Sequence, residues 1–251
     1  MKILYRVVLL AVVFALLAFS MHVYASKIDD RIESSARNSY VFRTYLHADD
    51  IKIRSMDGVV SLTGTVSEES HKSLAQETVA NLSGVTSVDN KLEVKGEHPV
   101  ENSDAWLTTK VKTMLLFHRN VSAKTEVNTK DGIVTLKGEA GSQAQKDLTT
   151  EYAKDVEGVK DVNNEMTAAK TSKKTGRTVG EKIDDASITA LVKMTLLYHR
   201  STSALNTKVE TKNGVVTLRG KAKNAAEKDL AGKFVNDVNG VKRVKNLMTI
   251  G

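Results

Sequence analysis

Residues 130–139 read KDGIVTLKGE, a short apolar run held between two glycines that are six positions apart. The dipeptide Asp131-Gly132 predicts a two-residue hairpin turn, because such a turn needs positive φ angles that Gly, Asn and Asp tolerate best. The glycine-rich end of the same stretch also fits a loop that binds phosphate through backbone N–H groups. The rest of the chain separates these two interpretations.

The stretch occurs three times: DGVVSLTG begins at Asp57 and NGVVTLRG at Asn213. In each copy a third glycine follows at the same distance from the second, and an asparagine (Asn90, Asn164 or Asn246) lies six positions further on. This internal spacing is kept although the copies themselves are unevenly spaced, so the sequence predicts three tandem units joined by linkers of variable length. The glycines expected to have structural roles are Gly58, Gly64, Gly84, Gly132, Gly138, Gly158, Gly214, Gly220 and Gly240.

The hydrophobic period changes in a fixed order within each unit. In the second unit, a helical stripe that includes Leu107 and Met114 predicts a first helix with Asp104 as its N-cap. A hairpin follows, in which Gly138 is expected to end the second strand, and a second helix is predicted to end at Gly158 as its C′ residue. A third strand completes the unit. In the third unit, Asn224 and Glu227 predict a capping-box start for the second helix.

The order α-β-β-α-β predicts an α+β fold, with two helices packed on a three-stranded mixed sheet in each unit. Such units have thin cores, so we expect packing between units to contribute stability. The predicted boundaries are 1–25 for a signal peptide, 26–95, 104–167 and 185–251 for the units, and 96–103 and 168–184 for the linkers.

The N-terminus is typical of an export signal. Lys2 and Arg6 precede an uninterrupted apolar run from Val7 to Phe19, and small residues stand before Ser26 in the pattern of a signal-peptidase site. The run is shorter than the ~20 residues of a membrane-spanning helix. We therefore expect cleavage after Ala25, with an uncleaved anchor as the alternative. Export makes nucleic acid an unexpected partner.

The repeated pattern of a helix, [DN]-G-[VI]-V-[ST]-L-x-G, a helix and G-V-x-x-V-x-N resembles the BON domain. This domain is named for bacterial osmotically inducible Y and nodulation proteins, and the resemblance covers nearly all of the mature chain. A cysteine-free exported chain is similar to the osmotically inducible Y type rather than to the lipoprotein type. The resemblance implies a periplasmic protein linked to osmotic or envelope stress. It also implies phospholipid binding or chaperone-like help to outer-membrane proteins.

Residues typical of catalysis or metal binding are sparse. The chain has no cysteine and no G-x-S-x-G motif, and none of its six histidines has the spacing of a metal ligand. His118 and His199 stand at matching places, each before an arginine. We interpret them as polar groups near helix C-termini, with a catalytic pair as the alternative. Asp49-Asp50 and Asp184-Asp185 are interpreted as caps. We therefore expect a protein without metal, cofactor or enzymatic activity.

Positive charge is concentrated in the third unit. Residues 185–251 contain 12 basic and 5 acidic residues, whereas residues 26–95 contain 9 and 11. Such a surface attracts anionic headgroups or acidic proteins, although a merely soluble lysine-rich surface has the same composition. The candidate contact residues of this unit are Lys221, Lys223, Lys242, Arg243 and Lys245.

Trp106 is the single tryptophan of the chain. On a helical wheel it lies close to Lys110 and Phe117, a combination that suits insertion into a membrane interface. Packing against a neighbouring unit explains the same three residues, because tryptophan favours interfaces of both kinds.

The leading hypothesis is a non-enzymatic periplasmic protein that binds anionic phospholipid. Trp106 would supply apolar contact and the basic third unit electrostatic attraction. The alternative is a chaperone or adaptor that binds unfolded envelope proteins at an exposed strand edge.

Overall fold

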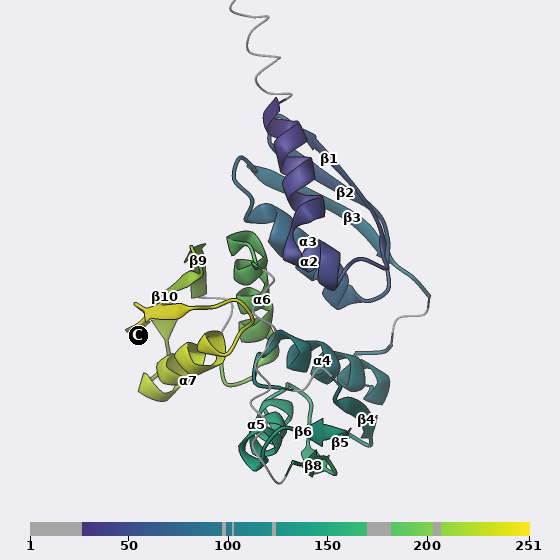
Figure 1. Ribbon diagram of the computed structural model, residues 1–251, viewed down its shortest axis with the longest axis vertical. Helices are drawn as coiled ribbons and strands as arrows, with labels where there is room; N and C mark the ends of the chain where they lie inside the picture. The colour runs from purple at the N-terminus through teal and green to yellow at the C-terminus, as the bar shows by residue number, and fades with distance from the viewer. Residues whose placement is uncertain (1–26, 97–98, 102, 122–123, 170–181, 203–206) are drawn as a thin grey trace, which may run out of the picture.

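The computed structural model describes residues 27–96, 99–101, 103–121, 124–169, 182–202 and 207–251. The predicted signal peptide lies outside these residues. Three α+β units follow one another along the chain, which confirms the predicted fold (Figure 1).

The elements of each unit keep the predicted order. The first unit contains a helix over residues 27–38, α2 (Tyr40–Thr44), β1 (Asp50–Met56), β2 (Val59–Val66), α3 (Glu69–Ala80) and β3 (Ser87–Val94). The second contains α4 (Asp104–Phe117), β4 (Glu126–Lys130), β5 (Ile133–Lys137), β6 (Glu139–Ala140), α5 (Gln143–Lys154), β7 (Asp161–Asn164) and β8 (Thr167–Ala168). The third contains α6 (Asp185–Tyr198), β9 (Thr207–Lys212), β10 (Val215–Ala222), α7 (Ala225–Asn236), β11 (Arg243–Asn246) and β12 (Thr249–Ile250).

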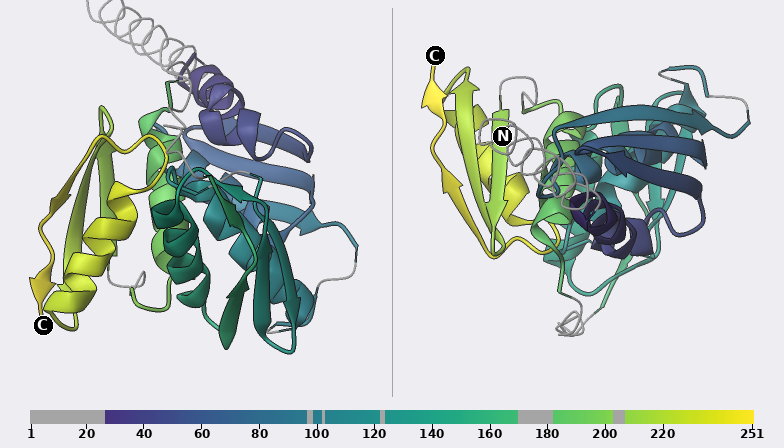
Figure 2. Two further views of the ribbon diagram at one scale, coloured as in Figure 1. Left: turned by 60° about the horizontal axis from the view of Figure 1, so that its bottom comes forward. Right: turned by 90° about the horizontal axis from the view of Figure 1, so that it is seen from above.

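The main sheet of each unit is mixed, and in the third unit β12 adds a fourth strand, parallel to β10, to the three that were predicted. The hairpin strands pair antiparallel and the third strand pairs parallel to the second, so the second strand lies in the middle. Alternate residues of the middle strand, such as Val216 and Leu218, are fully buried on the inner face. The helices of each unit cover this inner face, and the outer face of the third unit's sheet stays open at the edge of the molecule (Figure 2).

The hairpin corner has the expected turn. Asp131 and Gly132 have φ angles of 55° and 81°, which is the signature of a type I′ turn. Asp104 accepts hydrogen bonds from the backbone N–H groups of both residues, at 2.7 and 2.9 Å. Asp29 and Asp185 hold the other two hairpins in the same way.

The prediction that Asp104 caps its own helix is therefore wrong. Ser103 is the N-cap of α4 and accepts a hydrogen bond from Trp106 N–H at 3.3 Å. Asp104 stands one position later, where its carboxylate reaches the hairpin turn instead. The predicted caps at Asn224 and Asp184 are confirmed, since their side chains accept from Glu227 N–H and Ser187 N–H at 2.8 Å each.

Asp104→Ala is expected to lower the free energy of unfolding by about 1.5–3 kcal/mol, because two N–H groups lose a charged acceptor. Urea denaturation followed by circular dichroism measures this difference. Glu151→Ala on the exposed side of α5 is the control and should change stability by less than about 0.5 kcal/mol. An Asp104 variant as stable as this control would contradict the assigned role.

The prediction that the second glycine ends its strand holds only in the second unit, where β5 ends at Lys137, directly before Gly138. β2 and β10 continue through Gly64 and Gly220, and β6 resumes directly after Gly138. Gly138 has a φ of 126°, and a Cβ there would lie 2.8 Å from the Lys124 carbonyl oxygen. Only glycine permits this close approach, and the kinked strand then goes on to pair with β8.

The prediction that α5 ends at Gly158 is also wrong. The helix ends at Lys154 with Asp155 as its C-cap, and Gly158 lies in the turn before β7. The next residue after the cap, Val156, forms an isolated β-bridge with His199 of the third unit.

The repeated asparagine connects the third strand to the second helix. Asn164 donates to the Lys146 carbonyl oxygen at 2.9 Å and accepts from Met166 N–H at 2.9 Å. Asn90 and Asn246 make the same two contacts in their own units.

Helix α6 lies at the centre of the molecule, between the three units (Figure 1). Its residues join the cores of the first and third units into one apolar cluster, which also takes in Phe117 of α4. The other core residues of the second unit form a separate cluster, to which α7 contributes Phe234. At its N-terminus, Asp184 and Ser187 accept hydrogen bonds from Tyr40 N–H and Val41 N–H of α2, at 2.8 and 3.0 Å. Packing between units thus supplies much of the core, as expected for units this small.

Candidate functional site

The outer face of the third unit's sheet is strongly basic. The strand register places six basic side chains and a single acidic one, Glu210, on this face. The basic residues are Lys208, Lys212, Arg219, Lys221, Arg243 and Lys245, all exposed. We call this surface the basic sheet face. Glu210 forms ion pairs with Arg219 and Lys208, at 2.7 and 3.1 Å.

The corresponding faces of the other units carry no such excess. In the first unit, three basic residues (Lys52, Arg54 and Lys91) share the outer face with three acidic ones (Asp50, Asp89 and Glu93). In the second unit, Lys130 and Lys137 share it with Glu126, Glu139 and Asp161. The basic sheet face is therefore a local property of the third unit rather than a general feature of the fold.

Of the predicted contact residues, Lys221, Arg243 and Lys245 lie within the basic sheet face. Lys223 follows β10 and Lys242 precedes β11, so both lie at its ends. The side-chain carbons of Lys242 pack against Gly214 in the hairpin turn. Sequence reasoning missed that Lys208, Lys212 and Arg219 share one face with them, because that depends on the strand register.

A groove of about 720 Å³ lies where the three units meet. Trp106 and Lys110 of α4 form one wall, and Met194, Leu197 and Tyr198 of α6 form another. The remaining wall comes from the first unit, at the start of α3 and the end of β3. We call this the three-unit groove.

Lys110 is held over aromatic rings in the three-unit groove. Its ammonium lies 4.3 Å from the centroid of the Trp106 ring and 5.7 Å from that of Tyr198. Burial lowers the pKa of Lys110, and the nearby carboxylates of Glu157 and Glu101 only partly oppose this effect. Both predicted residues therefore line a partly enclosed site rather than an open surface.

Phe117 lies elsewhere. Its side chain is fully buried, and its ring meets Tyr45 of the first unit edge to face, with centroids 5.6 Å apart. Phe117 therefore packs between units, which was the alternative to membrane insertion, and its side chain is not accessible to a membrane. The basic sheet face and the three-unit groove are also separate, because α6 lines the groove from the inner side of the third unit's sheet (Figure 2).

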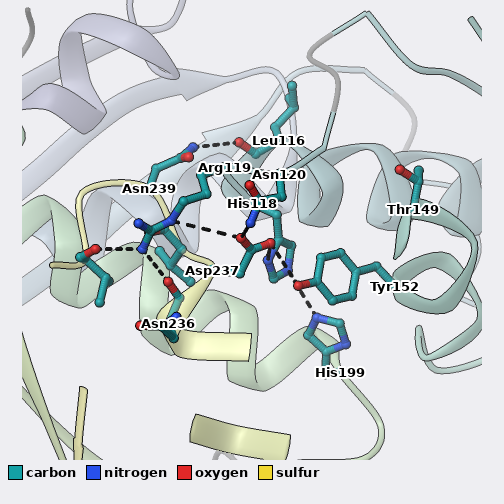
Figure 3. A network of polar contacts seen from close by, with 12 residues as sticks. Leu116, His118, Arg119, Asn120, Thr149, Tyr152, His199, Asn236, Asp237 and Asn239 are labelled. Carbon is teal, nitrogen blue, oxygen red and sulfur yellow. Dashed lines mark hydrogen bonds and ion pairs between the residues drawn. The ribbon is translucent and has the colours of Figure 1, made fainter. Parts of the chain in front are cut away.

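His118 and His199 meet at the boundary between the second and third units (Figure 3). They are the C-caps of α4 and α6, and their exposed fractions are 2% and 1%. Their Nε2 atoms are 3.2 Å apart. The position at the helix ends agrees with the prediction, but the partners lie in a neighbouring unit. We call these two residues the histidine pair.

Each histidine also faces a carboxylate from the opposite unit. His199 Nδ1 lies 2.9 Å from Asp155, the C-cap of α5, and His118 Nδ1 lies 3.4 Å from Asp237, the C-cap of α7. Burial alone would raise the pKa of Asp155, but hydrogen bonds from His199 and Ser201 outweigh burial and hold it below its usual range.

The contact between these units has approximate two-fold symmetry. Within the second unit, His118 stacks on Tyr152 with ring centroids 4.0 Å apart. Within the third unit, His199 stacks on Phe234 in the same way, with centroids 3.8 Å apart. Across the boundary, the backbone N–H of Arg119 donates to the backbone carbonyl oxygen of Asp237 at 2.8 Å. The backbone N–H of Arg200 donates in the same way to that of Asp155, also at 2.8 Å. Because equivalent residues bind in both directions, the interface is of the isologous type. The hydrogen bond from Tyr152 OH to Asp237, at 2.8 Å, breaks the symmetry, because Phe234 has no hydroxyl to make its counterpart.

The first unit lacks this set of residues. Asn81 is the C-cap of α3, where the other units have an aspartate, and Thr78 stands where they have Tyr152 and Phe234. A sequence signal for the interface does exist, since the two histidines and the two aspartates recur at nearly the same interval along the chain. The interval alone does not indicate that the two copies lie against each other.

A family model described as BON domain matches residues 28–96, 103–170 and 184–251. The chain belongs to the BON family. Osmotically-inducible protein Y of Escherichia coli (strain K12) is 34% identical over 197 residues, which cover 78% of this chain and 95% of that protein. A 21 kDa hemolysin of Actinobacillus pleuropneumoniae is 34% identical over 122 residues, which cover 49% of this chain and 60% of the relative.

Among solved structures, CdsD, a structural protein of the type III secretion system of Chlamydia trachomatis, aligns with this BON-family chain at a TM-score of 0.25 and 17% identity. The alignment covers 88% of this chain and 90% of that one. In the described part of the chain, no group of three or more His, Cys, Asp or Glu side chains is arranged to hold a metal ion. No helix among these residues combines the length and the apolar composition needed to cross a bilayer.

Proposed function

We propose that the chain is an exported, periplasmic, non-enzymatic BON protein that binds anionic phospholipid surfaces through its basic sheet face. The single observation that supports this is the excess of six basic residues over one acidic residue on that face, against balanced or slightly acidic faces in the other units. Similarity to an osmotically inducible protein supports a role under osmotic stress.

The physical basis is electrostatic attraction to lipid headgroups. An open, twisted sheet face presents its lysines and arginines together, and each contributes about 1 kcal/mol near an anionic membrane. Lys212, Lys221 and Lys245 are exposed, so their ammonium groups reach headgroups without losing buried contacts. The attraction falls off within a Debye length of about 8 Å at physiological salt, so binding should weaken as salt is added.

The triple variant Lys212→Glu/Arg243→Glu/Lys245→Glu is expected to lose roughly 100-fold in affinity for vesicles that contain anionic phospholipid. Co-sedimentation with such vesicles, and with neutral vesicles as a reference, measures the loss. The matched control is Lys52→Glu/Lys112→Glu/Lys130→Glu, which changes the net charge equally at exposed sites of the other units. Equal losses in both variants would contradict a role for this face in particular.

Trp106→Ala should leave this vesicle binding nearly unchanged, because Trp106 lines the three-unit groove on the other side of α6. A loss of binding comparable to that of the basic triple variant would show instead that α4 contacts the lipid.

The three-unit groove favours a second candidate function, binding of unfolded envelope proteins. Trp106 and Leu197 offer an apolar wall to an extended client segment, rather than the strand edge expected from the sequence. This function predicts that the chain suppresses aggregation of a denatured outer-membrane protein without lipid. The suppression should weaken in Trp106→Ala and persist in the basic triple variant.

A further inference from the structure

The hydrogen bonds around the histidine pair determine which ring nitrogens carry a proton. His199 Nδ1 lies 2.9 Å from the Asp155 carboxylate, so it carries a proton and donates to it. The Nε2 atom of His199 then offers a lone pair, and His118 Nε2–H donates to it across 3.2 Å. His118 Nδ1 is left without a proton and has no hydrogen-bond partner among the described residues. One proton on each ring satisfies the contact between the rings.

Added protons change this contact in two steps. A first proton enters at His118 Nδ1, which faces Asp237 at 3.4 Å. A second proton can bind only at His199 Nε2. It would then point at the His118 Nε2–H group, whose nitrogen lies 3.2 Å away. Two charged imidazoles in direct contact repel each other strongly where water is excluded. The contact between the rings therefore tolerates one added proton and not two.

Charged groups face the histidine pair from four helix ends. Asp155 at the end of α5 and Asp237 at the end of α7 carry the negative charges. Arg200 lies beside Asp155 at 3.7 Å and Arg119 beside Asp237 at 4.0 Å, so each carboxylate already has a cation next to it. Tyr152 stacks on His118, and its hydroxyl donates to Asp237. The two carboxylates thus cannot fully neutralise two extra positive charges.

We propose that the histidine pair is an acid-released latch, which holds the second and third units together at neutral pH and lets them separate when both rings are protonated. Arg119, Asn120, Arg200 and Ser201 also make polar contacts across this boundary, and they directly follow the pair in the chain. Asn239 binds the carbonyl groups of Leu116 and Phe117, which directly precede His118, so displacement of the rings disturbs these contacts too. Separation would expose the packed rings of Tyr152 and Phe234, and would also part the walls of the three-unit groove that come from α4 and α6. A protein in the periplasm, the compartment proposed above, meets such pH changes because small solutes cross the outer membrane freely.

The direction of the pH dependence agrees with the surroundings of His118. Burial lowers the pKa of His118, the charge of His199 lowers it further, and Asp237 only partly compensates. The folded-state pKa is thus below the unfolded value of about 6.5. Stability from this site is complete above that value and is lost as the pH falls through the folded-state pKa. Acid, not base, should open the latch.

The test uses the full chain labelled at two equivalent positions. Because the chain has no cysteine, Ala144→Cys and Ala226→Cys place single labels on exposed sites in the first turns of α5 and α7. Distances between spin labels are then measured from about pH 7.5 to about pH 5, the range in which histidines titrate. We expect one narrow distance at neutral pH and a longer, broad distribution in acid, with more than one proton taken up per transition.

The matched variant is His118→Gln/His199→Gln, whose amides can hydrogen-bond without titrating in this range. It should keep the neutral-pH distance in acid, whereas the control His71→Gln, which removes the pair with Asp49, should open like the parent chain. Wild-type chains that stay closed at pH 5, or a double variant that opens at the wild-type midpoint, would overturn the proposal.

If the double variant fails to fold, a second measurement tests the proposal without it. Histidine NMR resonances of the unlabelled wild-type chain report the protonation of His118 and His199 directly. Both must titrate together with the change in distance. Titration of both rings without opening would equally overturn the latch.

Discussion

Asp237→Ala is expected to lower the free energy of unfolding by about 3–5 kcal/mol, the usual cost of removing one partner from a buried charged network. The Asp237 side chain accepts a hydrogen bond from Tyr152 OH at 2.8 Å and another from the Asn120 side chain. It also faces His118 and is only 6% exposed. Its removal leaves the buried Tyr152 hydroxyl without an acceptor and the buried His118 without the carboxylate that faces it, so the second and third units should separate before either unfolds.

Trp106 fluorescence makes this loss measurable, because the single tryptophan lies in the second unit next to α6. Urea titration followed by fluorescence and by circular dichroism should give coincident curves for the wild type and separate curves for Asp237→Ala. Asp229→Ala, on the exposed side of α7, is the control and should behave as the wild type. A loss of less than about 1 kcal/mol for Asp237→Ala would show that the network is not needed for stability.

Leu191→Ala is expected to cost about 2–5 kcal/mol, the range for truncating a fully buried leucine. Leu191 is fully buried in α6, within the apolar cluster that the first and third units share. Because one core serves both units, the substitution should lower the melting temperature of both together, although Leu191 belongs to the third. Differential scanning calorimetry of the full chain measures the shift.

Leu107→Ala provides the contrast for this prediction. Leu107 is equally buried but belongs to the separate cluster of the second unit. Its truncation should destabilise that unit and leave a later transition for the shared core near its wild-type temperature. If Leu191→Ala lowered the stability of the third unit alone, the first unit would have to be stable without α6.

Local chemistry made the units predictable from the sequence. The turn at Asp131-Gly132 needs only the backbone preferences of two residues, and the cap at Asn224 needs only the next turn of its own helix. Where a side chain had a choice between local and distant partners, the sequence was less informative. Asp104 is a good helix cap by composition, yet it binds a hairpin 27 residues away.

The candidate sites depend on distances that a one-dimensional pattern does not contain. The excess charge of the third unit was visible in its composition, but the basic sheet face requires the pairing of Arg219 with Lys208 across two strands. Trp106 and Lys110 were identified from their helical spacing, whereas Tyr198, which completes the site around Lys110, comes from the first helix of another unit. The histidine pair required the packing of whole units.

The two-fold contact between the second and third units has an evolutionary consequence. A surface in which each partner supplies the same residues is the geometry of a symmetric homodimer. Duplication of a self-associating ancestor, followed by fusion through a linker, produces such a contact directly. A homodimer is complete with two members, and the first unit, which has Asn81 in place of the aspartate, is the odd member. The contact therefore has no place for a third copy, and the first unit is held in the molecule instead by its packing on α6.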